Sequence, residues 1–440
     1  MVIEGMDVLC CRISIGDADV DNPMKINGGI EISEVSEIEI TESYKKLIGT
    51  AKLKFPKGTV CRSTILGNGT PEGKDVSRIT TEIMQDGVII EKRSTQSILD
   101  TTTFKVGQRI NIKLGYSGAL KNMFDGYITG YNSDSILELT CENMAYKLKL
   151  KQAPKFETPD AGTTVNEVLE GKYDLLKNTG FKIHNDTKKF EIHIGKVKVT
   201  DNFTVADILS EWSKYKVYCF LKYDIEDEGK MPSIAIGRPY SSSKAQPVFP
   251  ADESSGPYPI RFDYHVAQSD LKIIKTDPQF LAITGKALGK DEKFFEVTVR
   301  MNPEYDATIA GSKEFQVINA TQISKKSHKL TGNVTASGAQ TKTKVDLSTY
   351  TVVPYMSPHV GITSNQLVEE TTEYFRNYNL NGISGSVTIF GDYGLSPAVQ
   401  VELIDCRNPS KEGVFLVEEV TTSFGTNGYR QKISIPYRIR

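Results

Sequence analysis

The residues whose types and spacing suit chemistry are few in this sequence. The glycine-rich stretch GNGTPEG (67–73) lacks the G-x-G-x-x-G spacing of a phosphate loop, and Pro71 interrupts it. His184 and His193 lie nine residues apart around an expected turn, while His265, His328 and His359 are isolated. Zinc sites need clustered ligands at short spacing. We therefore expect no metal site, no cofactor site and no nucleotide loop.

Acidic residues are the other candidates, because a glycosidase needs two carboxylates. The chain has 55 Asp and Glu residues, and nothing in the sequence singles out a pair. The basic runs YKLKLKQAPK (146–155) and SKKSHK (324–329) are more typical of solvated faces than of nucleic-acid sites. We therefore expect no catalytic residues and no specific nucleic-acid recognition, so the chain is predicted not to be an enzyme.

The composition fits a soluble globular protein of several domains. The 440 residues are 39% hydrophobic and 25% charged, with a net charge of -2. The N-terminus lacks the pattern of a signal peptide, and no stretch has the length and apolarity needed for stable membrane insertion. The six cysteines form no C-x-x-C pair, which suits the reduced, mostly buried thiols of a protein made in the cytoplasm.

Alternation of apolar and polar residues predicts a first β-barrel over residues 1–150. VSEIEITESYKKLIGTAKLKF (35–55) alternates on both sides of a charged turn. A long polar excursion follows over 57–105, in which DGVIIEKR and TQSILDTTTF are expected to be hairpin arms. RINIKLGYS (109–117) and MFDGYITGYNSDSILELTC (123–141) supply further strands, and the basic segment YKLKLK (146–151) follows them.

Helix signals appear in residues 151–255, which we expect to form an α/β insertion domain. Thr164 and Glu167 make a capping box, and Thr204 caps a second helix that carries Asp207 in its first turn. Two apolar stripes should be buried: Val165, Val168 and Leu169 on the first helix, and Val205, Ile208, Leu209 and Trp212 on the second. The Pro/Ser-rich segment 241–259 is expected to be a linker.

The remaining sequence predicts a second β-barrel. Residues 256–380 are expected to start it, with a polar loop over 325–350 and a helix capped by Thr363 and Gln366. That helix should bury Leu367, Val368, Tyr374, Phe375 and Tyr378, and Asn381-Gly382 should end it. Residues 381–440 supply the closing strands, in which Ile433 and Ile435 should point inward and Lys432 and Ser434 outward.

The two β-regions repeat one another in order and pattern. RINIKLGYS corresponds to AVQVELIDC (398–406), and each is followed by a turn and a strand that contains glycine, at Gly126 and Gly413. Each region then ends in an alternating strand, at 137–141 and 432–437. The identities are few, so the repetition lies mainly in periodicity. It predicts a fold that is mainly β, with two similar antiparallel β-barrels plus helix-containing domains.

The order of these parts resembles the baseplate hub proteins of contractile phage tails, the late control protein D-like family, and the base of the related VgrG spikes. The motifs that carry the resemblance are F-D-G-x-I, FTVADILSEWSKYKVYCFLK, GSVTIFGDYGLSPAVQVEL and GVFLVEEVTTSFGTNGYRQKISI. The family typically has Pro-Gly before the strand near residue 398, whereas this chain has Ser396-Pro397-Ala398. The resemblance covers residues 1–56 and 105–440.

The resemblance implies a structural hub: a homotrimer whose two barrels per chain form a ring around part of a central channel. Such a ring would adapt a sixfold tail tube to a threefold spike in a virion tail or phage-like contractile injection particle. Its implied partners are the tail tube protein, a separate spike protein and other baseplate proteins. We expect a separate spike because the chain stops at Arg440, directly after the last barrel strand. Two alternatives remain: a glycan-binding or adhesin-type β-protein, and a cell-wall hydrolase on a β-scaffold.

Overall fold

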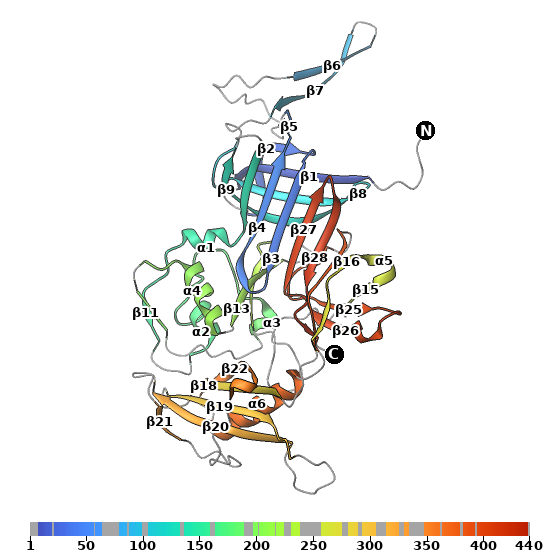
Figure 1. Cartoon of the computed structure of the whole chain (residues 1–440). Helices are drawn as coiled ribbons and strands as arrows, with labels where there is room; N and C mark the ends of the chain where they lie inside the picture. The colour runs from blue at the N-terminus through green and yellow to red at the C-terminus, as the bar shows by residue number, and fades with distance from the viewer. Residues whose placement is uncertain are drawn as a thin grey trace.

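The computed structural model confirms a mainly β chain with an α/β domain (Figure 1). The structure describes residues 8–19, 22–56, 58–63, 79–85, 88–98, 104–132, 136–158, 163–188, 197–200, 202–215, 217–223, 230–237, 257–274, 280–288, 293–304, 314–324, 330–333, 347–360, 363–378, 382–391 and 394–438. The glycine-rich stretch 67–73, His193, His328 and most of segment 241–259 lie outside these residues. None of the described helices is long and apolar enough to cross a membrane.

The first β-unit curls seven strands around one apolar core. In β4, for example, period-two alternation places Ala51, Leu53 and Phe55 in this core. All neighbouring strands in this unit are antiparallel. The strands are β1 (Leu9–Ala18), β2 (Ile26–Ile32), β3 (Glu37–Ser43), β4 (Lys46–Phe55), β8 (Arg109–Tyr116), β9 (Ala119–Asn132) and β10 (Leu137–Asn143).

The polar excursion 57–105 extends this sheet as β5 (Val60–Ser63), β7 (Val88–Ile98) and β6 (Ile79–Gln85), with β6 at the edge. The expectation that DGVIIEKR and TQSILDTTTF form two arms was wrong, because Val88–Ile98 is a single strand paired with β6. The hairpin projects from the first β-unit at the end away from the other domains (Figure 1).

The α/β domain follows β10 through α1 (Tyr146–Leu150) and buries the two predicted helix stripes in one core. The capping box of Thr164 and Glu167 is confirmed at α2 (Val165–Leu169), and Thr204 caps α4 (Val205–Glu211) as predicted. Asp207 bonds back to the backbone of Thr204, so α4 also begins with a capping box. The other elements are β11 (Phe156–Glu157), α3 (Asn185–Lys188), β12 (Lys198–Val199), η2 (Trp212–Tyr215), β13 (Tyr218–Lys222) and β14 (Ser233–Gly237).

The second β-unit starts at Tyr258 and resumes at Gly382. Ile433 and Ile435 are fully buried and Lys432 is exposed, as predicted, although the strand ends at Ser434 and a short β29 follows. Its elements are β15 (Tyr258–Arg261), α5 (Phe262–His265), β16 (Val266–Ser269), β17 (Lys272–Ile274), β23 (Gly382–Ser384), β24 (Ser386–Phe390), β25 (Gln400–Ile404), η6 (Pro409–Lys411), β26 (Gly413–Leu416), β27 (Glu419–Gly425), β28 (Gly428–Ser434) and β29 (Tyr437–Arg438).

Between β17 and β23 the chain builds a separate five-stranded sheet, packed on α6 (Ser364–Tyr378). Thr363 and Gln366 cap α6 as predicted, and Leu367 and Phe375 are buried. The loop expected over 325–350 contains a strand at Leu330–Asn333, which pairs with β20. The strands are β18 (Leu281–Leu288), β19 (Lys293–Met301), β20 (Phe315–Ser324), β21 (Leu330–Asn333) and β22 (Thr351–Val360), with η4 (Leu347–Thr349) before β22.

Candidate functional site: a repeated sheet, its open edges and a polar joint

Four strands of the first β-unit recur in the second in the same spatial order. The large sheet reads β16-β24-β28-β27 and continues directly as β3-β4-β10-β9. In the second unit Ile433 of β28 lies between Val387 and Val420. In the first unit Cys141 of β10 lies between Ala51 and Ile128. All six side chains are buried, so the two four-strand modules share strand order, strand direction and the buried face.

The repeat extends to the neighbouring strands. β9 pairs with β8 along its first part and with β10 along its second. In the second unit, β26 pairs with β25 and the following β27 pairs with β28. The two glycines are not equivalent, however: Gly126 lies opposite Ile110 at the start of β8, and Gly413 lies opposite Leu403 at the end of β25. The predicted repeat of the strands is therefore confirmed, but the predicted alignment of Gly126 with Gly413 is wrong.

Within the chain the two modules join edge to edge. β27, the last strand of one module, pairs with β3, the first strand of the other, over seven residue pairs that include Thr422 with Ile40. The outer strands of the joined modules are β16 and the end of β9. β16 pairs only with β24 among the described strands, and no described strand pairs with β9 beyond Tyr127 on the side away from β10. These two edges lie on opposite flanks of the sheet (Figure 1).

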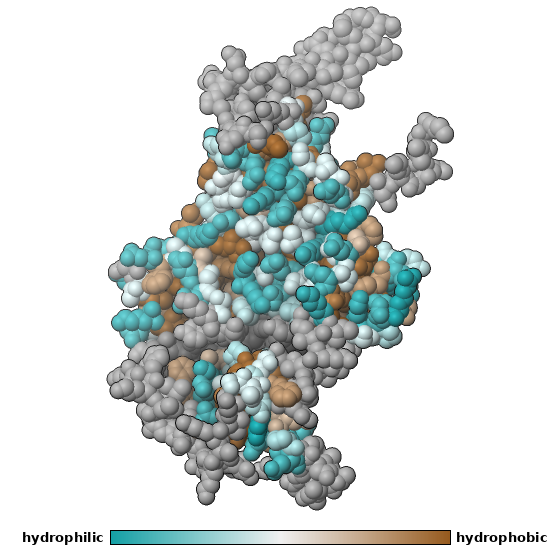
Figure 2. Space-filling model, viewed as in Figure 1, coloured by the Kyte–Doolittle hydropathy of each residue, from teal (hydrophilic) through white to brown (hydrophobic). Residues whose placement is uncertain are grey.

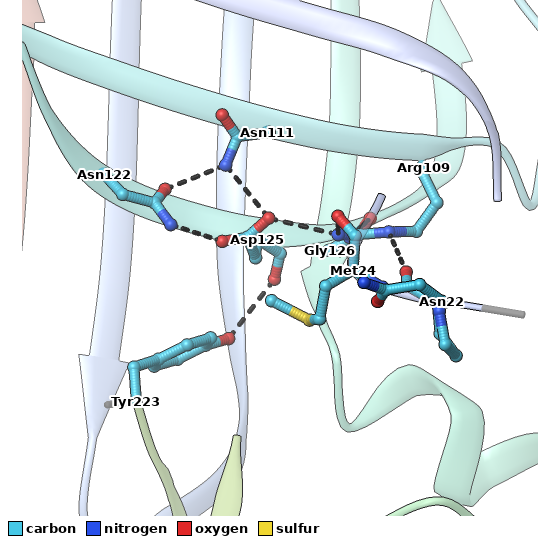
Figure 3. Close-up of polar contacts among 9 residues, drawn as sticks. Asn22, Met24, Arg109, Asn111, Asn122, Asp125, Gly126 and Tyr223 are labelled. Carbon is cyan, nitrogen blue, oxygen red and sulfur yellow. Dashed lines mark hydrogen bonds and ion pairs between the residues drawn. The ribbon is translucent and has the colours of Figure 1, made fainter. Parts of the chain in front are cut away.

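A buried ion pair fixes the start of the β8–β9 hairpin (Figure 3). Arg109 is fully buried, and its guanidinium lies 3.1 Å from a carboxylate oxygen of Asp125. It also donates to the backbone oxygens of Pro23, Met24 and Gly126 at 2.9, 3.3 and 2.7 Å. With three backbone acceptors and a carboxylate around it, the buried charge is compensated, as such a charge must be.

Asp125 links β8, β9 and the α/β domain through its side chain and its backbone oxygen. Asn111 and Asn122 donate to Asp125 at 2.9 and 2.5 Å, and the hydroxyl of Tyr223 donates to its backbone oxygen at 3.3 Å. Asp125 is the acidic residue of the F-D-G motif. The motif was recognised in the sequence, but the partners of its carboxylate were not predicted. This arrangement joins parts of the fold and leaves the Asp125 carboxylate engaged by donors, which suits a structural joint.

A pocket of about 440 Å³ lies beside this joint, where the first β-unit, the α/β domain and the second β-unit meet. Its wall includes Glu42, Asp125, Tyr223, Ala398 and Thr422. Loss of solvation, with a smaller contribution from the charge of Asp125, raises the pKa of the Glu42 carboxyl to about 7. At this junction of the two β-units and the α/β domain, the ionised form of the Glu42 carboxyl is therefore disfavoured.

The histidines and cysteines in the described part of the chain do not converge on one site. Among the described residues there is no group of three or more His, Cys, Asp and Glu side chains suited to a metal ion. His265 accepts a hydrogen bond from the backbone of Arg261 at 3.0 Å, within α5 and the strand before it. Burial raises the pKa of the Cys11 thiol to about 11, and that of Cys141 and Cys219 further, so these thiols are not poised as nucleophiles.

Comparisons with known proteins complete this description. No family model matches the chain, and no curated protein sequence matches it. Among solved structures, a 43 kDa tail protein of prophage MuSo2 from Shewanella oneidensis is 13% identical, with 98% of each chain covered and a TM-score of 0.48. A tail protein from Neisseria meningitidis is 12% identical, covering 98% of this chain and 96% of that one, with a TM-score of 0.48. A Francisella structure containing VgrG is 9% identical, covering 98% of this chain and 58% of that one, at 0.46. The solved structures to which this chain is similar are thus phage tail proteins and VgrG-related proteins.

Proposed function

We propose that the chain is the structural hub of a phage tail or phage-like contractile injection particle, and that three copies close into a ring of six modules. The observation that carries the proposal is the tandem repeat of the four-strand module in one continuous sheet. A chain with two equivalent modules presents six similar units in a trimer, which suits a sixfold tail tube on one side and a threefold spike on the other. In this role the protein acts as a scaffold and catalyses no reaction.

The contact between copies follows from the contact inside the chain. β3 joins β27 within the chain, and the counterparts of these strands are β16 and the second part of β9, the two open edges. β16 of one copy should therefore pair with β9 of the next. Because two different edges meet, the contact is heterologous and repeats around an axis until the ring closes. A permanent ring of this kind should bury well over about 1,000 Å² at each contact.

The internal repeat also specifies the register of that contact. Ile40 lies opposite Ala51 and Thr422, while Ser269 lies opposite Val387, the counterpart of Ala51. Thr422 lies opposite Gln431, just as Tyr131 lies opposite Leu139 in the first module. Ser269 therefore corresponds to Ile40 and Tyr131 to Thr422. In the ring, Ser269 of one copy should lie opposite Tyr131 of the next.

A pair of cysteines tests this register. Opposite residues of antiparallel strands have Cα atoms about 4.5–5.5 Å apart, which a disulfide can span. The double variant Tyr131→Cys/Ser269→Cys, made with the exposed Cys406 changed to Ser, should give a covalent trimer on oxidation. Each single variant, and the pair Tyr131→Cys/Ser410→Cys, should stay uncrosslinked. A ladder of dimers and longer open chains would contradict ring closure, and an uncrosslinked double variant in assembled particles would contradict the edge pairing.

The hydrolase alternative predicts a different outcome. Purified wild-type chain should release no soluble fragments from bacterial peptidoglycan. Cleavage that disappears when one Asp or Glu is changed would replace the structural proposal by the enzymatic one.

A further inference from the structure

One face of the joined modules lies away from the apolar cores over most of its area. The other face packs on the cores of the two β-units. Figure 2 shows hydrophilic and neutral residues across the middle of the molecule, where β3, β4, β27 and β28 lie toward the viewer in Figure 1. We call this surface the ladder face and define it by the outward residues of β16, β24, β28, β27, β3, β4, β10 and β9.

Side chains of the ladder face form rows that cross the strands. One row runs through Glu37, Lys54 and Glu138, which lie opposite one another on β3, β4 and β10. The Lys54 ammonium lies 2.7 Å from a Glu37 carboxylate oxygen. Hydrogen bonding to Glu37, followed by its charge and those of Glu138 and Glu39, raises the pKa of Lys54. Each charge in this row therefore has an opposite charge beside it.

The next row begins with Phe390 and continues through Arg430, Ser423, Glu39 and Lys52. The Arg430 guanidinium lies 4.4 Å from the centre of the Phe390 ring, which is 40% exposed and is the large apolar side chain of this row. Thr388, Lys432, Thr421, Thr41, Thr50 and Glu142 form a third row. Hydroxyls therefore separate the charged residues.

Charges on the ladder face balance. Its solvent-accessible charged residues are five acids and five bases: Glu37, Glu39, Glu138, Glu142, Glu419, Lys46, Lys52, Lys54, Arg430 and Lys432. Asp125 of β9 is buried on the same side of the sheet and is paired with Arg109. Lys46 lies 3.7 Å from Glu419, and Lys149 of α1 contacts Glu142 at 2.7 Å. A polyanion binds through clusters of basic residues that acidic neighbours do not compensate. On the ladder face Lys46 and Lys54 are paired with acids, Lys52 lies opposite Glu39, and Arg430 lies over the Phe390 ring, so its basic residues form no such cluster.

We propose that the ladder face is the wall of the central channel, and that its neutral, hydroxyl-rich rows let charged macromolecules pass without binding them. The inference rests on the proposed ring, in which one face of the continued sheet surrounds the axis. The polar rows stay hydrated in that position, and the apolar cores lie on the other side of the sheet. The balance of charge makes the wall equally poor at retaining DNA and at retaining a basic protein.

Thiol accessibility tests the location of the face. Each of the variants Thr140→Cys and Ser423→Cys is first closed into a ring by the Tyr131–Ser269 crosslink and is then treated with a maleimide. The introduced thiol should react with a small maleimide but not with a maleimide attached to a bulky polymer. The same cysteines in the unassembled chain should react with both reagents. Lys177→Cys, at an exposed site in the α/β domain, is the control and should react with both reagents in either state.

Outcomes separate the two proposals. Failure to obtain a covalent trimer would refute the ring itself. A covalent trimer whose Thr140→Cys and Ser423→Cys positions react fully with the bulky reagent would leave the ring intact and refute the channel wall.

DNA binding tests the charge balance. The wild-type ring should leave the fluorescence anisotropy of a labelled single-stranded DNA unchanged at physiological salt. The triple variant Glu37→Gln/Glu39→Gln/Glu138→Gln leaves Lys52 and Lys54 without the acids that lie opposite them, so it should bind the DNA at least tenfold more tightly, and added salt should abolish this gain. Binding by the wild-type ring, or the absence of any gain in the variant, would overturn the neutral-wall argument.

Discussion

At the scale of single residues, Arg109 and Asp125 are the most consequential pair in the fold. Both side chains are buried, and the ion pair of 3.1 Å holds β8, β9 and the Pro23–Met24 backbone together. Asp125→Asn removes the carboxylate and leaves a buried guanidinium without a counter-charge. We expect this change to lower the free energy of unfolding by about 3–5 kcal/mol, measured by denaturant titration.

The matched control is Glu37→Gln, which breaks an exposed ion pair of 2.7 Å with Lys54. Exposed ion pairs contribute little because water and salt screen them, so this variant should be nearly as stable as the wild type. Equal costs for the two changes would show that the Arg109–Asp125 network is not a structural joint.

Glu42 should make the stability depend on pH in the direction opposite to most carboxylates. The pKa of its carboxyl is about 7 in the folded chain, compared with 4.5 for a solvated Glu side chain, which represents the unfolded chain. The folded chain therefore binds this proton more tightly. The free energy of unfolding should therefore fall as pH rises from about 4.5 to 7, and stay low above that.

Glu42→Gln removes this titration. We expect the variant to match the wild type near pH 5 and to be more stable by about 1–3 kcal/mol at pH 8, in denaturant titrations at both pH values. Glu39→Gln, on the exposed face of the same strand, should show no such difference between the two pH values. A pH-independent effect of Glu42→Gln would contradict the account of the pocket.

Ala398 adopts a backbone conformation that favours glycine. Its φ is +64°, in the left-handed region, and its side chain is buried. A non-glycine residue in this region costs about 1–2 kcal/mol, and the small buried methyl group offsets part of that cost. Ala398→Gly should therefore raise the free energy of unfolding by up to about 1 kcal/mol in thermal or denaturant unfolding. A loss of more than about 1 kcal/mol would show that packing of the methyl group outweighs the strain.

At the scale of elements, the last long strand is the part of the second β-unit most open to test. β28 pairs with both β24 and β27, and Ile433 and Ile435 are fully buried. Burying an Ile side chain contributes about 1.5–3 kcal/mol, and truncation would also leave two strands without part of their pairing. A chain that ends at Gln431 should be insoluble on expression. Soluble protein with a cooperative melting transition would contradict this role of the strand.

Local patterns allowed many elements to be predicted. The predicted helix caps at Thr164, Thr204 and Thr363 were confirmed, because a cap is a contact between residues three apart and is readable from the sequence. The hairpin of β3 and β4 was likewise readable from its alternation. The strand order, including the direct pairing of β27 with β3, depends on residues nearly four hundred positions apart and has no local signature.

The separate sheet between β17 and β23 and the polar joint around Asp125 could not be predicted, because both depend on contacts between residues far apart in the sequence. β17 and β23 pair as a hairpin would, although the chain between them folds into its own five-stranded sheet. Alternation in β18 and β19 indicates strands without showing which sheet they join. Arg109 and Asp125 each sit in an ordinary strand pattern, and their pairing appears only when β8 and β9 are placed side by side.

At the scale of the whole molecule, the arrangement of modules is the central claim. One chain carries two copies of a four-strand module, joined through β27 and β3 and ending in open edges on opposite flanks. Electron-microscopy images of the assembled particle, averaged along its axis, test the claim most directly. We predict six similar lobes around a central channel, threefold symmetry in the outer domains, and a mass of three chains of 48.8 kDa each. A closed twofold particle, or an open helical filament of chains, would contradict the account.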